Sequence, residues 1–564
     1  MLSRRALKCL LAIVGAAAAC SRGTDVHIRP CTAADAAVTL AVDEYVSIDP
    51  ASNSGCSVFP ATTSLAARYL VMPQLATGVP GQIAGFRLGG DTILPVPPPS
   101  ALVAEPAAAL SAAERFHGFL RLGDERRFWG FAPETAFARS PAISPTSASG
   151  PPAMNSLRQF MVCAKTDCSA FNRVGARVRA LTSKVAIYVD TLAPAGQPDS
   201  AALDSIATTF DQRLYAIDTA AFGRESDIDS NSVVLVLMTN TVNKLVTAAQ
   251  CNAGGFIAGF FFGADIDPAF QNDSRSNKGE IFYSIVADPA GTLSCPHPAS
   301  DLQRFVPVTF IHEFQHMISF NQHVLVRGGT GEVLWLNEGF SHYAEELGGR
   351  SYAASFDAKV TDCIIGTVEC RFYGGNLVNA YNYLDTTGKH FLLPTAGIGT
   401  LAERGAAWLF VRYVLDHYAA GGTHADWNAL TRSLEATSQT GAGNIATVTG
   451  ESFATIVSRW ALANYVTDGG ARPELTYNSW NLHAVYSSLH TQNQNVFRKF
   501  YPLVPTGSAG RAVSLSGTLR AGSGVYHLID QPAGDPGFTL SFTAPNGDVI
   551  TAGVVPRLNV IRLQ

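Results

Sequence analysis

The hydrophobic and polar positions of this chain follow a different pattern in each of three successive regions. In residues 38–138, short apolar runs alternate with Gly, Pro and Ser, which is typical of β-strands joined by turns. The runs that predict strands are 38–42, 69–71 and 82–88. Because these runs are short and closely spaced, they predict a small all-β domain, either a sandwich or a related fold.

Residues 156–500 combine strand-like and helix-like patterns. Apolar runs at 184–190, 233–238 and 279–287 predict strands. After the first run, apolar residues at helical spacing predict an amphipathic helix with one face made of Leu203, Ile206, Phe210, Leu214 and Ile217. Beyond residue 300 the spacing is helical, and we expect helices at 302–322, 336–348, 403–419 and 451–467. A sheet followed by helices predicts an α+β domain.

Residues 501–564 return to a strand-like pattern. Strands are expected at 525–529 and 538–542, and the Pro-Asn-Gly-Asp sequence at 545–548 predicts a hairpin-like turn. Residues 139–155 are rich in Pro, Ser and Gly, so they predict a linker between the first all-β region and the α+β region. The chain is therefore expected to contain several domains, with all-β domains at both ends.

The first 19 residues have the pattern of a signal peptide. A basic segment precedes residues 9–19, which are apolar but too few to span a bilayer. Cys20 follows four small residues and resembles the Cys of a bacterial lipobox, which is lipidated; ordinary cleavage just before Cys20 is the alternative. Residues 20–37 are small and polar and predict a tether. We expect export, as an envelope lipoprotein or as a secreted protein.

Cysteine use agrees with export. Of the 10 cysteines, Cys9 falls in the signal peptide and Cys20 is the candidate for lipid attachment. The other eight form an even set, which in an exported chain indicates disulfides. Spacing does not determine the connectivity, but pairing of neighbours predicts Cys31–Cys56, Cys163–Cys168, Cys251–Cys295 and Cys363–Cys370.

The charge pattern limits the classes of partner. The formal net charge is −5, and the 40 basic and 45 acidic residues are mixed along the chain without long runs. Nucleic acid is therefore not an expected partner, and no basic patch for a membrane surface is apparent. We expect a monomer whose only membrane contact would be a lipid on Cys20.

The most informative segment is His312-Glu313-Phe314-Gln315-His316, an HExxH sequence inside an apolar helical pattern. Residues four apart lie on one face of a helix, so His312 and His316 are placed to bind one Zn²⁺. A buried helix must satisfy such polar side chains, and a zinc ion does so. Glu313 is then the candidate general base, which takes a proton from water and passes it to the leaving amine.

The third zinc ligand is expected further along the chain. The metzincin continuation requires Gly and His at positions held here by Ser319 and Gln322, so that variant is disfavoured. Residues 335–346 (WLNEGFSHYAEE) instead resemble the second motif of gluzincin peptidases, in which the Glu of Asn-Glu-Gly-Phe binds zinc. This resemblance implies that Glu338 is the third ligand. It also implies that Glu345, seven residues on, orients a zinc-binding His.

These motifs, followed by a helix with the sequence GAAWLFVRYVLDHY, are most similar to the hyicolysin-type zinc metallopeptidases of family M30. The resemblance implies an α+β zincin (gluzincin-like) catalytic domain, a Zn²⁺ cofactor, and protein or peptide substrates. The Gly-x-Met-Glu-Asn strand of M1 exopeptidases is absent, which favours an endopeptidase. The alternatives are a gluzincin-like exopeptidase or other zinc hydrolase, and a non-catalytic surface binding protein. The intact Glu313 argues against the last of these.

The group that stabilises the oxyanion is not specified by any motif. Residues 402–406 resemble a Tyr-x-Lys-Gly-Ala helix start, but Ala402 stands where that motif has its Tyr. Nearby candidates for the missing donor are Tyr373, Tyr381, Tyr383 and His390.

One further acidic segment, Asp227-x-Asp229-x-Asn231, resembles part of a Ca²⁺-binding loop. It lacks the Gly and the distal Glu of an EF-hand, so we expect a polar turn.

Overall fold

The structure is a computed structural model that describes residues 31, 37–91, 110–129, 150–395, 397–467 and 472–564. The predicted signal peptide, Cys20, nearly all of the tether and most of the 139–155 linker lie outside the described residues. None of the described helices is long and apolar enough to cross a membrane.

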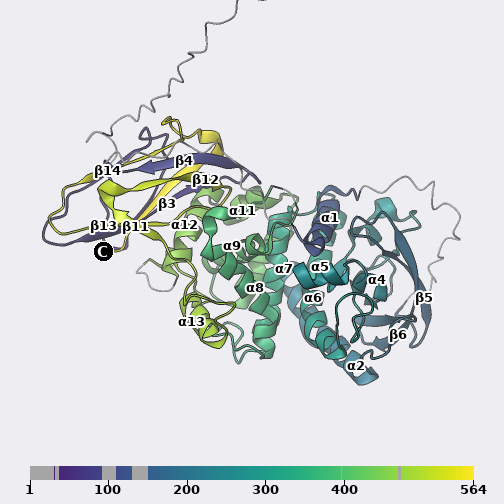
Figure 1. Cartoon of the computed structure of the whole chain (residues 1–564). Coiled ribbons are helices and arrows are strands. Elements are labelled where there is room, and N and C mark those ends of the chain that lie inside the picture. The colour runs from purple at the N-terminus through teal and green to yellow at the C-terminus, as the bar shows by residue number, and fades with distance from the viewer. Residues whose placement is uncertain (1–30, 32–36, 92–109, 130–149, 396, 468–471) are drawn as a thin grey trace, which may run out of the picture.

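A six-stranded mixed sheet forms one lobe, on the right of Figure 1. Its order is β5-β6-β7-β8-β10-β9, with parallel pairing at β7–β8 and β8–β10 and antiparallel pairing elsewhere. The strands are β5 (Leu157–Cys163), β6 (Phe171–Leu181), β7 (Val185–Asp190), β8 (Val234–Met238), β9 (Gly259–Phe261) and β10 (Ile281–Ser284). All residues of β8 are buried, which explains its uninterrupted apolar sequence. The short strand β9 forms one edge of this sheet.

The helices of this lobe include the one that carries the HExxH sequence. These are α2 (Ser200–Thr209), α3 (Tyr215–Phe222), α4 (Asn240–Asn243), α5 (Ala248–Gly254) and α6 (Ala299–Phe320). The single amphipathic helix predicted from Leu203 to Ile217 is α2 and α3 joined by a π-helical turn, Phe210–Leu214. Phe210 in this turn stacks on Phe310 of α6, with ring centroids 3.7 Å apart, so the predicted apolar face does pack on the HExxH helix.

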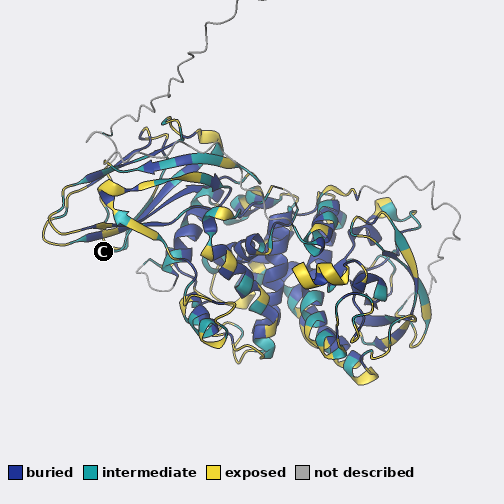
Figure 2. Cartoon of the chain, viewed as in Figure 1, coloured by how far each residue is buried: buried dark blue, intermediate teal, exposed yellow. Residues whose placement is uncertain are grey.

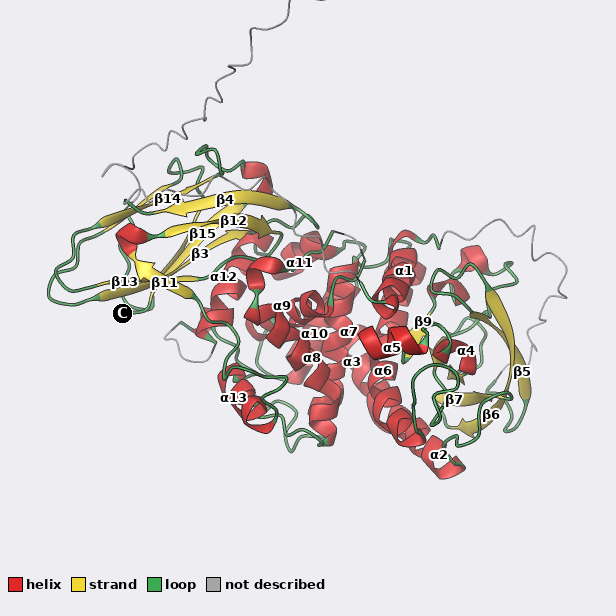
Figure 3. Ribbon diagram, viewed as in Figure 1, coloured by secondary structure: helices red, strands yellow, loops and turns green. Residues whose placement is uncertain are grey.

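The second lobe is a bundle of helices whose central members are almost entirely buried (Figures 2 and 3). Its helices are α7 (Leu334–Arg350), α8 (Val368–Asp385), α9 (Leu401–Tyr418), α10 (His424–Glu435), α11 (Gly441–Thr449), α12 (Phe453–Val466) and α13 (Leu482–Gln492). Close packing of α8 against α9 depends on Gly405, where a Cβ atom would lie 2.3 Å from the backbone nitrogen of Ala380. The helices predicted at 302–322, 336–348, 403–419 and 451–467 correspond to α6, α7, α9 and α12.

The β-strands at the two ends of the chain belong to one sandwich, which corrects the expectation of separate N- and C-terminal all-β domains. Its two sheets have the orders β1-β15-β3-β13-β11 and β12-β4-β14-β2. The strands are β1 (Tyr45–Ile48), β2 (Cys56–Phe59), β3 (Ala67–Leu75), β4 (Ile83–Gly89), β11 (Thr506–Ala509), β12 (Ser514–Arg520), β13 (His527–Gln531), β14 (Phe538–Thr543) and β15 (Pro556–Arg562). Because neighbours in each sheet come from both ends of the chain, neither segment could complete a sheet alone.

Two local expectations for the N-terminal region are wrong. The run 38–42 contains no strand, and the first strand is β1, because residues 42–43 form a turn. Residues 110–129 contain a helix, α1 (Ala112–Arg126), inside the region predicted to be all-β. Ser111 and Glu114 form a capping box at its start, a helix signal that composition alone does not reveal.

The eight described cysteines form the four disulfides predicted from neighbour pairing. The Cα–Cα distances are 5.5 Å for Cys31–Cys56, 4.9 Å for Cys163–Cys168, 6.0 Å for Cys251–Cys295 and 5.1 Å for Cys363–Cys370. These pairs are consistent with an oxidising compartment and thus with export.

Asp218 on α3 is fully buried, and neither carboxylate oxygen has a hydrogen-bond partner among the described residues. Burial raises the pKa of this carboxyl well above its ordinary value. The folded state therefore holds a proton that the unfolded chain releases at lower pH. Stability falls as pH rises from the unfolded pKa to the folded pKa.

We therefore expect Asp218→Asn to increase the free energy of unfolding by about 1–3 kcal/mol at about pH 8, because the amide needs no proton when the chain folds. The gain should shrink toward zero as the pH falls below about 3, where the wild-type carboxyl is mostly protonated in both states. Urea unfolding at several pH values measures this. Asp204→Asn, on the exposed face of α2, is the matched control. A loss of stability at about pH 8 would contradict the prediction.

Candidate metal centre

Two adjacent helices bring the predicted metal ligands together. α6 supplies His312 and His316, and α7 supplies Glu338. The Nε2 atoms of the two histidines are 3.2 Å apart. The carboxylate oxygens of Glu338 lie 3.5 Å from Nε2 of His316 and 3.8 Å from Nε2 of His312. His312 and His316 are one helical turn apart, and Glu338 follows His316 by 22 residues. All three nevertheless direct donor atoms at one point.

This arrangement fits a zinc ion. A tetrahedral site with bonds of about 2.0–2.2 Å places its ligand atoms about 3.3–3.6 Å apart, close to the separations found here. The Oε2 atom of Glu338 is buried and has no hydrogen-bond partner among the described residues, so an ion would satisfy it. Two imidazoles and one carboxylate are a donor set that zinc uses in catalytic sites, where a fourth position is left for water.

Each histidine is held by a contact on its other ring nitrogen. His312 donates from Nδ1 to Oε1 of Glu345 at 2.7 Å, and His316 donates from Nδ1 to Oδ1 of Asn337 at 3.0 Å. These contacts fix both rings in the tautomer that leaves Nε2 free to bind a metal. The structure therefore places Glu345 beside His312, and Asn337 lies in the corresponding position beside His316.

Burial and nearby charges determine the protonation of these groups. Burial lowers the pKa of His316 to about 3, which keeps the ring neutral. Burial also disfavours charge on His312, but the hydrogen bond to Glu345 and its negative charge raise the pKa of His312. Burial disfavours charge on Glu345 too, yet the His342 charge and the bond from His312 lower its pKa to about 2. Glu345 is therefore a carboxylate, which suits it to accept the Nδ1 proton of His312.

Glu313 lies beside the two histidines and is 1% exposed. The backbone N–H of Phe261, in edge strand β9, donates to its Oε2 atom at 2.8 Å. Arg121 of α1 forms an ion pair with the same oxygen at 3.4 Å, and Nδ1 of His117 is 3.8 Å from Oε1. Burial raises the pKa of Glu313, while the positive charge of Arg121 opposes that rise.

Sequence patterns did not reveal the contribution of α1 to this centre. Arg121 is 1% exposed, donates to the carbonyl of Phe261 at 2.7 Å and forms an ion pair with Asp124 at 2.9 Å. An Arg inside a short helix carries no recognisable signal, because its role depends on contacts with Phe261 and Glu313, which lie 140 and 192 residues away.

A second cation was also missed. Arg404, at the start of α9, places its guanidinium 3.9 Å from Oε2 of Glu338 and 3.9 Å from Glu114 of α1. The sequence did indicate a functional helix start at 402–406, although it pointed to the absent Tyr at Ala402 rather than to this Arg.

The candidate oxyanion donors make contacts away from the metal ligands. Tyr383 is hydrogen-bonded to Ser523, and Tyr381 accepts a bond from the backbone N–H of Lys499. His390 contacts Thr386, and Tyr373 packs edge-on against Trp480.

The acidic segment at 227–231 forms the expected polar turn. Asp227 accepts hydrogen bonds from the backbone N–H groups of Asn231 and Ser232, at 3.0 and 3.1 Å. The buried Glu280 joins Asp227 and Asp229 as a group of carboxylates close enough to share an ion. This cluster lies outside the metal centre.

One known protein resembles part of this chain. The neutral metalloprotease ShpI of Staphylococcus hyicus is 28% identical over 145 residues, which are 25% of this chain and 30% of that protein. No protein-family model matches the chain. The likeness supports a distant relationship to a metalloprotease, while membership of the hyicolysin-type family stays a prediction.

We expect Glu345→Gln to weaken zinc binding about 10- to 100-fold, because an amide is a poorer acceptor for the Nδ1–H group of His312. Competition with a chromogenic zinc chelator measures the affinity. Glu369→Gln, in the first turn of α8, is the control. Equal zinc affinities for wild type and Glu345→Gln would show that this contact does not support the ligand.

Proposed function

We propose that this protein is an exported, zinc-dependent endopeptidase in which His312, His316 and Glu338 hold the metal. The observation that carries the proposal is the convergence of these three side chains at separations that suit zinc, with the Glu313 carboxylate beside them. The distant likeness to a neutral metalloprotease supports the same reaction class.

Zinc bound at this centre would polarise the scissile carbonyl and lower the pKa of a water molecule. Glu313 is the group that takes the proton from that water and delivers it to the leaving amine. The Phe261 N–H group orients the carboxylate for this task, and burial, by raising its pKa, suits it to accept a proton. Glu345 and Asn337 accept the Nδ1 protons of His312 and His316, so each ring would present Nε2 to the metal.

Peptide hydrolysis also requires a donor for the oxyanion. Arg121 is already engaged with Glu313 and the carbonyl of Phe261. Apart from Arg121, His117 lies beside Glu313 and Arg404 lies beside Glu338, and each carries N–H groups without a task in holding zinc. We assign oxyanion stabilisation to one of these two residues. Both are mostly buried, with side-chain exposures of 18% and 12%, so their N–H groups act where water is scarce.

The first test uses Glu313→Gln in the mature chain. Wild type should bind about one zinc per chain and cleave an unstructured protein such as casein. The variant should keep its zinc and lose at least about a thousandfold in kcat, because it lacks the base. Metal analysis measures the zinc content, and cleavage of fluorescent casein measures kcat. Zinc binding without cleavage of any peptide would favour another zinc hydrolase, and absence of zinc would favour a binding protein.

The second test concerns α1. Because Arg121 is buried against Glu313 and β9, we propose that α1 is a working part of the centre rather than a removable inhibitory segment. Arg121→Met should lower kcat about 10- to 100-fold by misplacing the base. It should also move the acid limb of the pH–rate profile to higher pH, since the charge of Arg121 opposes the rise in the pKa of Glu313.

Arg126→Met, at the exposed end of the same helix, is the matched control. It should leave kcat and the acid limb of the pH–rate profile unchanged. A rise in kcat for Arg121→Met would show instead that α1 holds the protein in an inactive state.

A further inference from the structure

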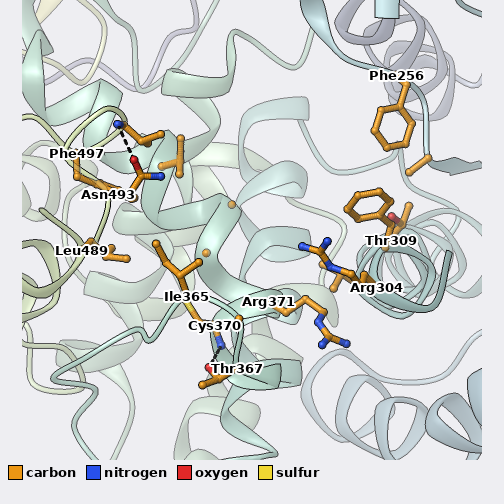
Figure 4. A pocket seen from close by; sticks show the side chains of 18 residues that line it. Phe256, Arg304, Thr309, Ile365, Thr367, Cys370, Arg371, Leu489, Asn493 and Phe497 are labelled. Carbon is orange, nitrogen blue, oxygen red and sulfur yellow. Dashed lines mark hydrogen bonds between the residues drawn. The ribbon is translucent and has the colours of Figure 1, made fainter. Parts of the chain in front are cut away.

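A large cavity lies between the HExxH helix and the helical lobe (Figure 4). Its volume is about 780 Å³, within the range of sites that bind extended or drug-sized ligands. One wall comes from the N-terminal half of α6, the other from α8 and the end of α13, and the segment before β9 contributes Phe256 and Ala258.

The cavity lies along the face of α6 that also carries His312. Phe305, Val308 and Thr309 line it, and they share a helical face with His312 at spacings of three, four and seven residues. Val308 lies about 6 Å before His312 along the helix axis, since each residue advances about 1.5 Å. A side chain one or two residues from the scissile bond would therefore reach this part of the cavity, because an extended peptide advances about 3.3 Å per residue.

The lining of the cavity combines an apolar surface with unbalanced positive charge. Aromatic and aliphatic residues from all its walls contribute, among them Phe256, Phe305, Val378, Leu489 and Phe497. Two arginines and no acidic residues line it. Figure 4 shows Arg304 and Arg371 extending into the gap between α6 and α8 from opposite walls.

Neither arginine is neutralised by a close ion pair. Arg304 has one weak pair, with Asp301 at 4.0 Å on the same helix, and its side chain is 59% exposed. For Arg371, no ion pair is found among the described residues. Arg304 lies eight residues, about 12 Å, before His312 along α6. An acidic side chain about two to four residues from the scissile bond is therefore within its reach.

We propose that this cavity is the specificity site of the enzyme, and that it selects peptide segments with a bulky apolar side chain next to the cleaved bond and an acidic residue two to four positions away. The apolar walls near Val308 contact the bulky apolar side chain, and the guanidinium groups of Arg304 and Arg371 bind the acidic side chain. This assignment rests on the proposed peptidase function, and it names the substrate class for it.

Gly375 offers a way to block the cavity without disturbing the fold. It lines the cavity on α8, and no atom lies within 4 Å of the position that its Cβ would occupy. Gly375→Phe would fill the cavity from one wall, and replacement of an exposed helical Gly favours the helix. Gly443→Phe, on the exposed side of α11, is the matched control.

The test is a set of peptides that differ only in having Glu, Gln or Lys at one position on either side of a fixed apolar cleavage site. Wild type should cleave the best Glu peptide with a kcat/KM about tenfold above its Gln counterpart at low salt, as expected for a charge-assisted contact. Arg371→Glu should reverse the preference toward Lys, whereas Arg173→Glu on the exposed face of β6 should not change it. Gly375→Phe should raise KM about tenfold for all these peptides, and Gly443→Phe should leave KM unchanged.

Equal cleavage of Glu and Gln peptides at every position, or the same preference in wild type and Arg371→Glu, would overturn the proposal. If wild type cleaves no peptide, the peptidase assignment fails. Peptide binding then tests whether the cavity selects the proposed segments. Fluorescence anisotropy of labelled peptides on the Glu313→Gln chain should show about tenfold tighter binding of the Glu peptide, lost in Gly375→Phe. Equal binding of all peptides would overturn the specificity site independently of catalysis.

Discussion

The structure depends on placing several ionisable groups in a buried interface between α6 and α7. His312, Glu313, His316, Glu338 and Glu345 are 8%, 1%, 1%, 1% and 9% exposed. A buried charge without a partner costs several kcal/mol, so each group needs a defined neighbour. Those neighbours come from every part of the α+β unit: edge strand β9, helix α1, the start of α9 and α7 itself. The centre therefore ties these elements to one another.

A second buried network holds α7 in the rotation that this centre requires. Glu346, next to Glu345, is fully buried and accepts hydrogen bonds from Trp408 and Trp480 at 2.9 Å and from Arg350 at 2.7 Å. Consecutive residues point about 100° apart on a helix, so anchoring Glu346 in the helical lobe turns Glu345 toward α6. The two adjacent carboxylates thus have separate tasks, one in the core of the lobe and one beside the metal ligands.

Local patterns were enough to predict helices α6 and α7 and the imidazole and carboxylate side chains that meet between them. The HExxH spacing, the Asn-Glu-Gly-Phe sequence and the helical periods of α6 and α7 each span only a few turns, and the side chains they name do meet. Contacts across long sequence separations were not predictable in this way. The ion pair between Arg121 and Glu313 spans 192 residues, and nothing in the sequence around Arg121 indicates its partner. The shared sandwich was not predicted either, because the sequence pattern of a strand does not indicate which distant strand pairs with it.

The sandwich explains how a helix from the N-terminal region reaches the metal centre. β3 pairs with β13 and β15, so the strands near the start of the chain are completed only by strands near its end. Such pairing carries a high loop-closure entropy, which the α+β unit between them reduces by folding into a compact body. Since α1 follows β4 in sequence and docks on β9, it connects the sandwich to the centre. Removing residues up to 138 would take away four sandwich strands and the partner of the buried Glu313 together. These contacts favour a chain that keeps its N-terminal region while it works.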